Sequence, residues 1–575
     1  MVPRMRTSQS RFGIARSWRP WGHWLRLGLL GVVVGSGGSG QSGCATPSAD
    51  LPPPDAAPPT DLLRPDLGPA AGDPQSWLTE AVGYEIFVRS FADSNGDGQG
   101  DLAGVTARLP YLAELGVNLL WLTPIHPSPS YHGYDVSDYE QIHSDFGTLA
   151  DFELLVRTAH RLQLRVVLDL VLNHTSQQHP WFTQALAAPA GSPAAARYLI
   201  RGDNPGWKWN GHDVWHAAPG GPAGRSYFGL FSGVMPDLNL RDAATVRAMQ
   251  DVMELWLRRG VDGFRLDAAR YIVEWPDPVT STAQPALADT AETKTLWRTL
   301  RGALQKAAPG AALLGEVWTD TDGISRYYGG GDGLHAAFNF PLAGATVDAV
   351  KRGVAEPVNY TLEAMTHTSV PLPFFAPFLT NHDQRRLASE LGGDPQLLRL
   401  AAALLLAMPG TPFLYYGEEV GLAQSSTQGD RGQRAPMPWA TVETQRGQTD
   451  SLLSYYRRLI KLRRQTPALR EAALRLLFPL VADPGLVAVS RGAAGPGKAP
   501  VIAVYNLGAR TLSGVQLSLP VDYPLGAQRE LLAGAAAAEV TDANRARYPL
   551  PTLLPRSALW LTAADTSGRA QSPGR

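Results

Sequence analysis

The sequence has very little cysteine and almost no net charge, and both features exclude certain classes of protein. The 575-residue chain contains one cysteine, Cys44, so no intramolecular disulfide can form and the fold must depend on its core. Its 51 basic and 52 acidic residues give a net charge of −1. Nucleic-acid binding calls for a basic excess or a basic face. The composition offers no such excess, so we expect no nucleic-acid partner.

Acidic residues are also absent from the first 26 positions, which contain six arginines. The apolar run that follows, residues 27–35, is much shorter than the roughly 20 residues that a membrane-spanning helix needs. A basic segment, a short apolar segment and then small residues are typical of a secretory signal. The sequence therefore predicts an exported protein.

Cys44 and the Pro- and Ala-rich stretch behind it extend this prediction. They resemble a bacterial lipoprotein signal, in which the cysteine carries a lipid, although Gln41 replaces the aliphatic residue that such signals favour. We expect an export segment at 1–44 and a solvated linker at 45–76. Membrane attachment would come only through a lipid on Cys44. The protein would be a cell-envelope lipoprotein or, without the lipid, a secreted protein.

From residue 82 onward, apolar runs of strand length alternate with segments of helical periodicity. Such alternation predicts an α/β fold, and eight runs with near-continuous apolar character predict a (β/α)8 TIM barrel of buried parallel strands. An open doubly wound sheet is the alternative, but no Gly-rich phosphate loop follows the first run. The eight expected strands are residues 84–91, 117–123, 165–171, 261–267, 311–317, 334–340, 374–380 and 411–416.

Two segments interrupt or follow this barrel. The irregular stretch after the third strand predicts an inserted domain at 174–237, so that the barrel comprises 77–173 and 238–466. Short β runs separated by Gly/Pro turns then predict a C-terminal antiparallel β-sandwich at 467–565. The last residues, 566–575, are expected to be disordered.

Polar side chains gather where the third, fourth, fifth and seventh predicted strands end. In a TIM barrel, the carboxyl ends of the strands form the active-site face. Each of these residues alone has a structural explanation, such as an ion pair or a buried histidine. Their joint placement on one rim indicates a catalytic site composed of His174, Arg265, Asp267, Glu316, His382 and Asp383.

Several carboxylates on one rim suit the cleavage of glycosidic bonds. One carboxyl group protonates the leaving oxygen, and the other attacks the anomeric carbon when about 5 Å separates them. In GFRLDAARY, residues 263–271, Arg265 and Asp267 share one face of a strand. The arginine would lower the pKa of Asp267 and keep it ionised. Apolar neighbours would keep Glu316 protonated.

These motifs also carry a family resemblance. DLVLNH (169–174), GFRLDAARY, GEVW (315–318) and FLTNHD (378–383) resemble the four ordered signature segments of the α-amylase superfamily of retaining glycoside hydrolases, and MPDLN (235–239) resembles a fifth. The resemblance implies that Asp267 is the nucleophile, Glu316 the acid/base and Asp383 the third carboxylate. It also implies substrate-binding residues around the sugar that precedes the cleaved bond, in the −1 site: Tyr134, Asp135, His174, Arg265, His382 and Arg434.

Some of these positions bear on specificity. Tyr134 would stack on the −1 sugar. Asp135 and Arg434 resemble a pair that closes the −1 site in exo-acting glucosidases. Arg270 and Tyr271 stand where many α-amylases have Lys-His, at positions that contact leaving-group sugars.

The sequence DSNGDGQGD, residues 93–101, offers a metal loop in which oxygen ligands alternate with glycines. Gly104 stands where an EF-hand has its bidentate Glu, so the loop is not an EF-hand. It resembles the calcium loop after the first strand on the oligo-1,6-glucosidase side of the superfamily. A polar turn without metal is the alternative. The resemblance implies a structural Ca2+ ion, without any organic cofactor, bound by Asp93, Asn95, Asp97, the carbonyl of Gln99 and Asp101.

The mixture of motifs resembles an intermediate group between oligo-1,6-glucosidases and neopullulanases, which includes bacterial lipoprotein α-amylases. It predicts an α-amylase that cleaves α-1,4 bonds in starch, glycogen or maltooligosaccharides through a covalent intermediate. The alternatives are an exo-acting α-glucosidase, or an α-glucosyl transferase such as a trehalose-forming mutase. A catalytically inactive glycan-binding protein is disfavoured because all three carboxylates are present.

Overall fold

The computed structural model describes residues 73–219, 224–274, 287–427, 429–494, 498–534 and 536–563. The export segment with Cys44 and the expected tail at 566–575 lie outside these residues. The linker predicted at 45–76 ends earlier than expected, because Asp73 caps helix α1 (Pro74–Glu80). Trp77 of this helix donates from Nε1 to the carbonyl of Gly310 at 2.9 Å. In the described part of the chain, no helix has the length and apolar character needed to cross a membrane.

Eight parallel strands form the central sheet, in the order β12-β11-β10-β9-β3-β2-β1-β13. A further parallel bridge between Phe378 and Phe413 joins the two ends of this order, so the sheet closes into the expected TIM barrel. The strands are β1 (Gly83–Ile86), β2 (Leu119–Leu122), β3 (Arg165–Leu170), β9 (Gly263–Leu266), β10 (Ala312–Gly315), β11 (Ala336–Phe338), β12 (Phe375–Ala376) and β13 (Phe413–Tyr415).

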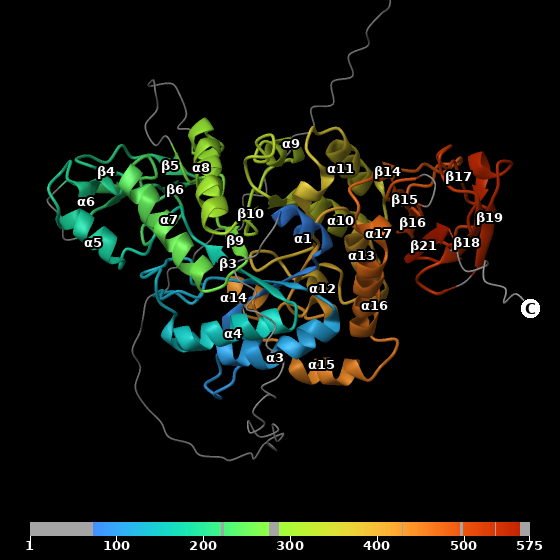
Figure 1. Cartoon of the computed structure of the whole chain (residues 1–575), viewed down its shortest axis with the longest axis horizontal. Helices are drawn as coiled ribbons and strands as arrows, with labels where there is room; N and C mark the ends of the chain where they lie inside the picture. Colours follow the sequence, from blue (N-terminus) through green and yellow to red (C-terminus); the bar gives the residue numbers. More distant parts are fainter. Residues whose placement is uncertain are drawn as a thin grey trace, which may run out of the picture.

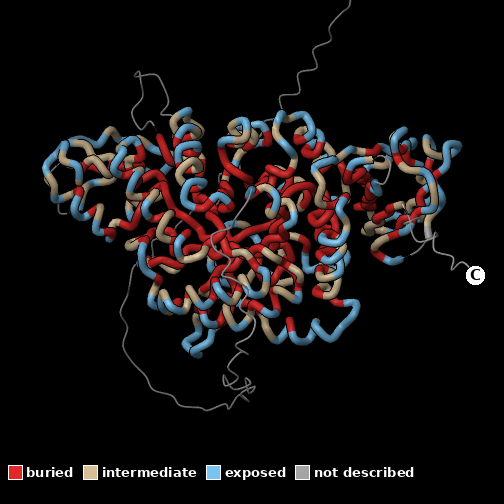
Figure 2. The backbone as a smooth tube through the Cα atoms, in the orientation of Figure 1, coloured by how far each residue is buried: buried red, intermediate tan, exposed pale blue. Residues whose placement is uncertain are grey.

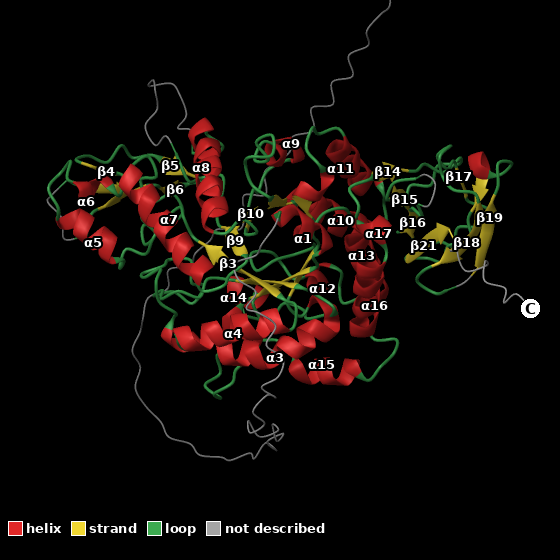
Figure 3. Ribbon diagram, viewed as in Figure 1, coloured by secondary structure: helices red, strands yellow, loops and turns green. Residues whose placement is uncertain are grey.

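Helices cover the outside of the barrel (Figures 1 and 3). The longer ones are α3 (Leu102–Leu115), α4 (Leu149–Arg161), α7 (Ala243–Arg258), α8 (Ala291–Ala307), α10 (Phe340–Arg352), α11 (Glu356–Thr366), α13 (Pro395–Ala407), α15 (Trp439–Arg446) and α16 (Leu452–Gln465). Shorter ones are α2 (Val88–Phe91), α9 (Thr321–Ser325), α12 (Leu387–Glu390), α14 (Asp430–Gln433) and α17 (Pro467–Arg470).

The first strand is shorter than the sequence predicts. β1 ends at Ile86, and the residues expected to continue it to 91 form the one-turn helix α2. This turn buries Val88 and Phe91, while Arg89 donates to Asp145 Oδ2 at 2.8 Å. A helical turn places the apolar pair on one side and the arginine on another, which a strand pairing at this position would not do.

Large aromatic side chains fill the inside of the barrel. The backbone in this central part of the molecule is coloured as buried in Figure 2. The rings of Trp121 and Phe413 lie 5.1 and 5.0 Å from that of Phe338. They fit because small residues face them: a Cβ atom at Gly83 would lie 2.3 Å from the Phe413 ring. Trp121 also donates from Nε1 to Asp169 Oδ2 at 3.2 Å. The aromatic layer thus supports a carboxylate at the end of β3.

An inserted segment follows β3 and lies at one end of the molecule (Figure 1). It contains two small antiparallel sheets and two short helices, with a core that includes Trp215 and Phe228. An antiparallel bridge between His174 and Asp237 joins its two ends. Its elements are α5 (Pro180–Ala187), α6 (Pro193–Ala196), β4 (Ile200–Arg201), β5 (Lys208–Trp209), β6 (His212–Asp213), β7 (Trp215–Ala217) and β8 (Ser226–Phe228).

The C-terminal domain lies at the other end and consists of antiparallel sheets, as predicted. One face of its six-stranded sheet, β14-β15-β16-β21-β18-β19, packs on the barrel, where Tyr505 donates to the carbonyl of Ala403 in α13 at 3.2 Å. The other face packs on the two-stranded sheet β17-β20. The strands are β14 (Leu474–Leu476), β15 (Leu486–Arg491), β16 (Val501–Asn506), β17 (Gln516–Leu517), β18 (Gly526–Glu530), β19 (Ala536–Val540), β20 (Tyr548–Pro549) and β21 (Ser557–Ala563).

Candidate active site

One buried arginine on β9 holds several carboxylates at the end of the barrel strands. Arg265 donates from Nη1 to Asp169 Oδ1 at 2.7 Å and to Asp267 Oδ1 at 2.8 Å. Its Nη2 lies 2.8 Å from Glu316 Oε2. Only 1% of Arg265 is exposed. Because a buried charge is tolerated only when it is paired, the guanidinium and these carboxylates depend on one another. Asp267 and Glu316 thus form ion pairs with the same cation, Arg265.

Burial changes the expected ionisation of Asp267. Although Arg265 lowers its pKa as predicted, burial has the larger effect and raises the pKa of Asp267 to about 6. The predicted effect of Arg265 is therefore present, but the net shift in the pKa of Asp267 is upward. Burial likewise outweighs Arg265 at Glu316 and raises the pKa of that carboxyl to about 7. Loss of water disfavours a charged carboxyl at both positions. The higher pKa belongs to Glu316, which suits the residue that must carry a proton.

The backbone beside Asp267 has two unusual conformations. Gly263 opens β9 with φ of 149°, and a Cβ atom there would lie 2.2 Å from the carbonyl oxygen of Ala312 in β10. Ala268 has φ of 47°, a left-handed conformation that residues other than glycine seldom adopt. This turn directs the N–H of Ala268 to Glu316 Oε2 at 2.9 Å. The chain therefore ties the acid to the strand of the nucleophile.

Asp383 lies between two cations. Its Oδ2 is 3.2 Å from His382 Nε2, and its Oδ1 accepts a hydrogen bond from Arg434 Nη2 at 2.9 Å. Burial opposes ionisation, but the charges of His382 and Arg434 outweigh it and lower the pKa of Asp383 below its ordinary value. Burial also opposes protonation of His382, yet the carboxylates of Asp383 and Glu85 raise the pKa of His382 to about 10. At neutral pH, Asp383 is ionised and His382 is charged.

Tyr134 and His174 extend this cluster of side chains. Tyr134 donates from its hydroxyl to Asp169 Oδ2 at 2.9 Å, and the same hydroxyl lies 2.7 Å from His382 Nε2. Its ring stacks on that of His382 with centroids 5.4 Å apart, so the stacking partner in the structure is a histidine. His174 Nε2 is hydrogen-bonded to the carbonyl of Tyr134 at 3.2 Å. Burial lowers the pKa of His174 to about 4, which keeps this imidazole neutral.

Asp135 and Arg434 do not form the pair that the resemblance implies. Asp135 Oδ1 accepts hydrogen bonds from Ser128 Oγ at 2.5 Å and from the hydroxyl of Ser130. Arg434 instead binds the third carboxylate and lies 3.2 Å from Asp430 Oδ2. Neighbouring hydroxyls satisfy Asp135 and other carboxylates satisfy Arg434. The expected closing pair is therefore wrong for this structure.

Two buried acids that position the site were missed by the sequence reasoning. Asp169 on β3 binds Arg265 and accepts a hydrogen bond from Trp121. Glu85 on β1 is hydrogen-bonded through Oε1 to His382 Nδ1 at 2.5 Å. Each is the single acid of its strand and is flanked by apolar residues or by tyrosine, in RVVLDL and GYEI. Because a lone buried acid requires a partner, this isolation is the signal that could have identified both residues.

Comparison with known proteins agrees with this arrangement. Residues 85–472 match the profile of the family described as "Alpha amylase, catalytic domain". The chain belongs to the α-amylase family. The eight-stranded barrel, the site at its carboxyl end and the C-terminal antiparallel domain are therefore those of an α-amylase family protein.

Relatives within the α-amylase family have more than one activity in their names. Alpha-amylase 3 from Dictyoglomus thermophilum is 35% identical over 422 residues, covering 69% of this chain and 79% of the relative. Trehalose synthase/amylase TreS from Mycobacterium tuberculosis is 33% identical over 526 residues, covering 77% and 84%. The crystal structure of the α-amylase from H. orenii matches with a TM-score of 0.70 and 33% identity, covering 84% and 99%. The protein is a glycoside hydrolase or a related enzyme of this family.

The loop predicted to bind calcium folds around the carboxylate of Asp93. Asp97 accepts hydrogen bonds from Asn95 Nδ2 at 3.2 Å and from the N–H of Gln99 at 2.8 Å. Asp101 instead serves as the N-cap of α3. Among the described residues, no three His, Cys, Asp or Glu side chains cluster as a metal site. Backbone bonds lower the pKa of Asp93, which accepts from the N–H groups of Gly98, Gly96 and Asn95.

A second group of oxygen atoms lies where β3 meets the inserted segment. Asn173 Oδ1, Asp237 Oδ1 and Glu274 Oε1 are buried and have no hydrogen-bond partner in the described chain outside this group. Burial raises the pKa of Asp237 to about 8, and burial together with the adjoining Asp237 raises that of Glu274. Unpartnered buried oxygens are rare, and carboxylate and amide oxygens are the ligands that Ca2+ prefers. This oxygen set fits a hard cation.

The two carboxyl pKa values predict a narrow, bell-shaped pH dependence of kcat/KM. Below about pH 6, Asp267 takes up a proton and is no longer a nucleophile; above about pH 7, Glu316 loses the proton that it must donate. Initial rates on a maltooligosaccharide across the acid and alkaline range measure both limbs.

The variant Glu316→Gln provides the control for this assignment when it is assayed on an α-glucosyl fluoride, whose leaving group needs no proton. We expect the alkaline limb to disappear and the acid limb to remain. An alkaline limb that persists in this variant would mean that another group is the acid.

Proposed function

We propose that the protein is an α-amylase that hydrolyses α-1,4-glucosidic bonds of starch, glycogen or maltooligosaccharides with retention of anomeric configuration. One observation carries the proposal: Asp267 and Glu316 contact different nitrogens of the same guanidinium, that of Arg265. Carboxylates held this way stand close together. Their proximity favours direct attack, which needs about 5 Å between them, over an inverting mechanism that needs about 6.5–9.5 Å.

Each carboxylate has a role that its contacts support. Asp267 attacks the anomeric carbon and forms the glucosyl ester. Glu316 Oε2 forms an ion pair with Arg265 and accepts a hydrogen bond from the N–H of Ala268, so its transferable proton belongs on Oε1, from which it passes to the leaving oxygen. The resulting carboxylate then activates the water that cleaves the ester. Asp383 remains ionised and offers acceptors to sugar hydroxyl groups.

Internal cleavage is favoured by one further observation. The resemblance links exo-action to an Asp135–Arg434 pair, and in the structure Asp135 is bound by Ser128 while Arg434 is bound elsewhere. The second candidate is α-glucosyl transfer, including trehalose formation, because a relative named trehalose synthase/amylase is 33% identical. Exo-acting α-glucosidase is the third possible activity.

The substitution Asp267→Asn tests the reaction type. Loss of the nucleophile should reduce starch cleavage by roughly 10⁴-fold or more, because no covalent intermediate can form. The matched control is Asp251→Asn, which changes an exposed acid paired with Arg247 on α7 and should leave the rate unchanged. Starch cleavage at an unchanged rate by the Asp267 variant would contradict the proposed mechanism.

Products of the unsubstituted enzyme then distinguish the candidate activities. Mixed oligosaccharides released from starch support the proposed internal cleavage. Glucose as the sole product from starch would replace it with exo-action. Trehalose made from maltose, or products longer than the substrate, would replace it with transfer.

The proposal includes structural calcium. The loop residues Asp93, Asn95 and Asp97 with the Gln99 carbonyl supply one oxygen set. The buried oxygens of Asn173, Asp237 and Glu274 supply another, at the base of the inserted segment. Bound calcium would neutralise these acids and stabilise the folded loops that carry them. No step of the reaction passes through the metal.

Calcium binding is tested by thermal unfolding with calcium or with a chelator. Chelation should lower the Tm of the unsubstituted protein by several degrees, since a ligand bound only to the folded state stabilises it. Asp93→Asn and Asp237→Asn should each bind less calcium, measured by elemental analysis, and the difference identifies which oxygen set holds the ion. An unsubstituted protein that contains no calcium and keeps its Tm under chelation contradicts this part of the proposal.

Export is the remaining part of the proposal, with Cys44 as the residue that would carry a lipid. Fractionation of cells that produce the full chain or its Cys44→Ser variant provides the test. The unsubstituted chain should be found with the membrane, and the variant should be released into the soluble extracytoplasmic fraction. Retention of the unsubstituted chain in the cytoplasm would contradict export, and equal fractionation of both forms would contradict lipidation.

A further inference from the structure

Arg270, three residues after the nucleophile, is bound within the chain. Its Nε donates to both carboxylate oxygens of Asp289 at 3.1 Å, and its Nη1 donates to the carbonyl of Trp318 at 2.5 Å. Tyr327 also donates to Asp289 Oδ1, at 2.6 Å. At a position where many α-amylases have a lysine that contacts leaving-group sugars, the guanidinium of Arg270 is engaged with protein groups. Arg270 instead ties the segment after β9 to the segment after β10.

Tyr271 is also directed to the protein. Its ring lies 5.9 Å from that of Trp209 and 5.5 Å from that of Phe231, both in the inserted segment. The two residues that replace Lys-His therefore hold neighbouring loops in place.

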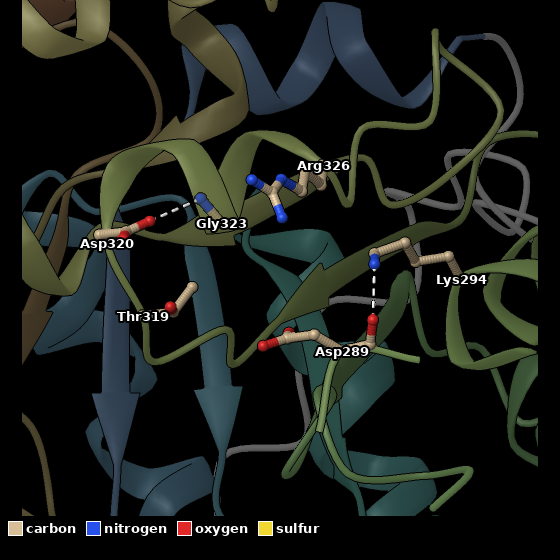
Figure 4. Close-up of a pocket in the computed structure, with 6 residues that line it drawn as sticks. All are labelled: Asp289, Lys294, Thr319, Asp320, Gly323 and Arg326. Atoms are coloured by element: carbon tan, nitrogen blue, oxygen red, sulfur yellow. Dashed lines mark hydrogen bonds between the residues drawn. The ribbon is translucent and has the colours of Figure 1, made fainter. Parts of the chain in front are cut away.

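A polar pocket of about 120 Å³ lies directly beside the Arg270–Asp289 contact. Figure 4 shows that its residues come from the start of α8 and from the segment around α9. Two acids and two bases balance its charge, and a threonine hydroxyl is included. Hydroxyl groups both donate and accept, so this mixture suits a neutral sugar better than an anion, which two carboxylates would repel. The lining is formed by Asp289, Lys294, Thr319, Asp320, Gly323 and Arg326.

Two residues of this pocket follow the catalytic acid Glu316 closely in the sequence. Glu316 gives its proton to the leaving oxygen, so the leaving-group sugars lie on its side of the broken bond. Two residues later comes Trp318, which is 47% exposed and whose ring stacks on that of Phe340 with centroids 4.4 Å apart. Thr319 and Asp320 of the pocket follow at once. The exposed Trp318 ring therefore stands between the catalytic acid and the pocket residues along the chain.

We propose that the pocket is a distal leaving-group subsite, which binds hydroxyl groups of a glucose unit beyond the first one released. This inference rests on the proposed cleavage of α-glucans. It assigns a binding site to the part of the glucan that leaves when the bond is cleaved. The pocket contributes no group to the reaction. It would increase the rate only for substrates long enough to occupy it.

Arg326→Ala tests the subsite against a closely matched control. Arg326 forms an exposed i,i+4 ion pair with Asp322 at 2.5 Å, and Arg352 forms the same kind of pair with Asp348 at 2.6 Å on α10. We expect Arg326→Ala to lower kcat/KM for maltoheptaose about tenfold, the effect of one lost hydrogen bond to a charged group. The value for maltotriose should not change. Arg352→Ala should leave both values unchanged.

Thr319→Val gives a second measurement, because it removes a pocket hydroxyl while keeping the side-chain volume. It should reduce the maltoheptaose value in the same selective way. If both pocket variants behave like Arg352→Ala on both substrates, the subsite proposal is overturned. A failure of the proposed function is distinguishable, since the unsubstituted enzyme would then release glucose alone, form transfer products, or leave both maltooligosaccharides uncleaved.

Discussion

The buried guanidinium of Arg265 is the constraint on which the rest of the site depends. It contacts Asp169, Asp267 and Glu316, and three largely buried carboxyl groups so close together could not ionise without such a cation. The contacts require the register of three neighbouring strands, β3, β9 and β10. Burial still raises the pKa of both reacting carboxyls, which leaves one as a nucleophile and the other as an acid near neutral pH.

Much of this arrangement could be predicted from local pattern. Parallel strands buried on both faces read as apolar runs, and polar residues at their ends meet on one face of a barrel. Asp267, Glu316 and Asp383 were found in this way, since each follows such a run. The one-turn helix at 88–91 was missed, because its apolar residues also suit a strand and only the packing of Phe91 decides between them.

Other features depend on contacts between distant residues and could not be predicted from local pattern. Glu85 and His382 are almost 300 positions apart, and the closed barrel brings them together. Arg270 binds Asp289, which lies 19 positions further along the chain, and no local pattern at Arg270 indicates this partner. The net pKa of Asp267 depends on how much water burial removes, which no two-residue spacing can report.

Asp267, held beside Glu316 by Arg265, is the residue that we expect to form a covalent bond with the substrate. Incubation with a fluorinated glucosyl fluoride that slows breakdown of the intermediate, followed by peptide mass spectrometry, measures this directly. We predict a single glucosyl label on the peptide that contains Asp267. A label on Glu316 or Asp383, or turnover of this reagent without any labelled peptide, would contradict the claim.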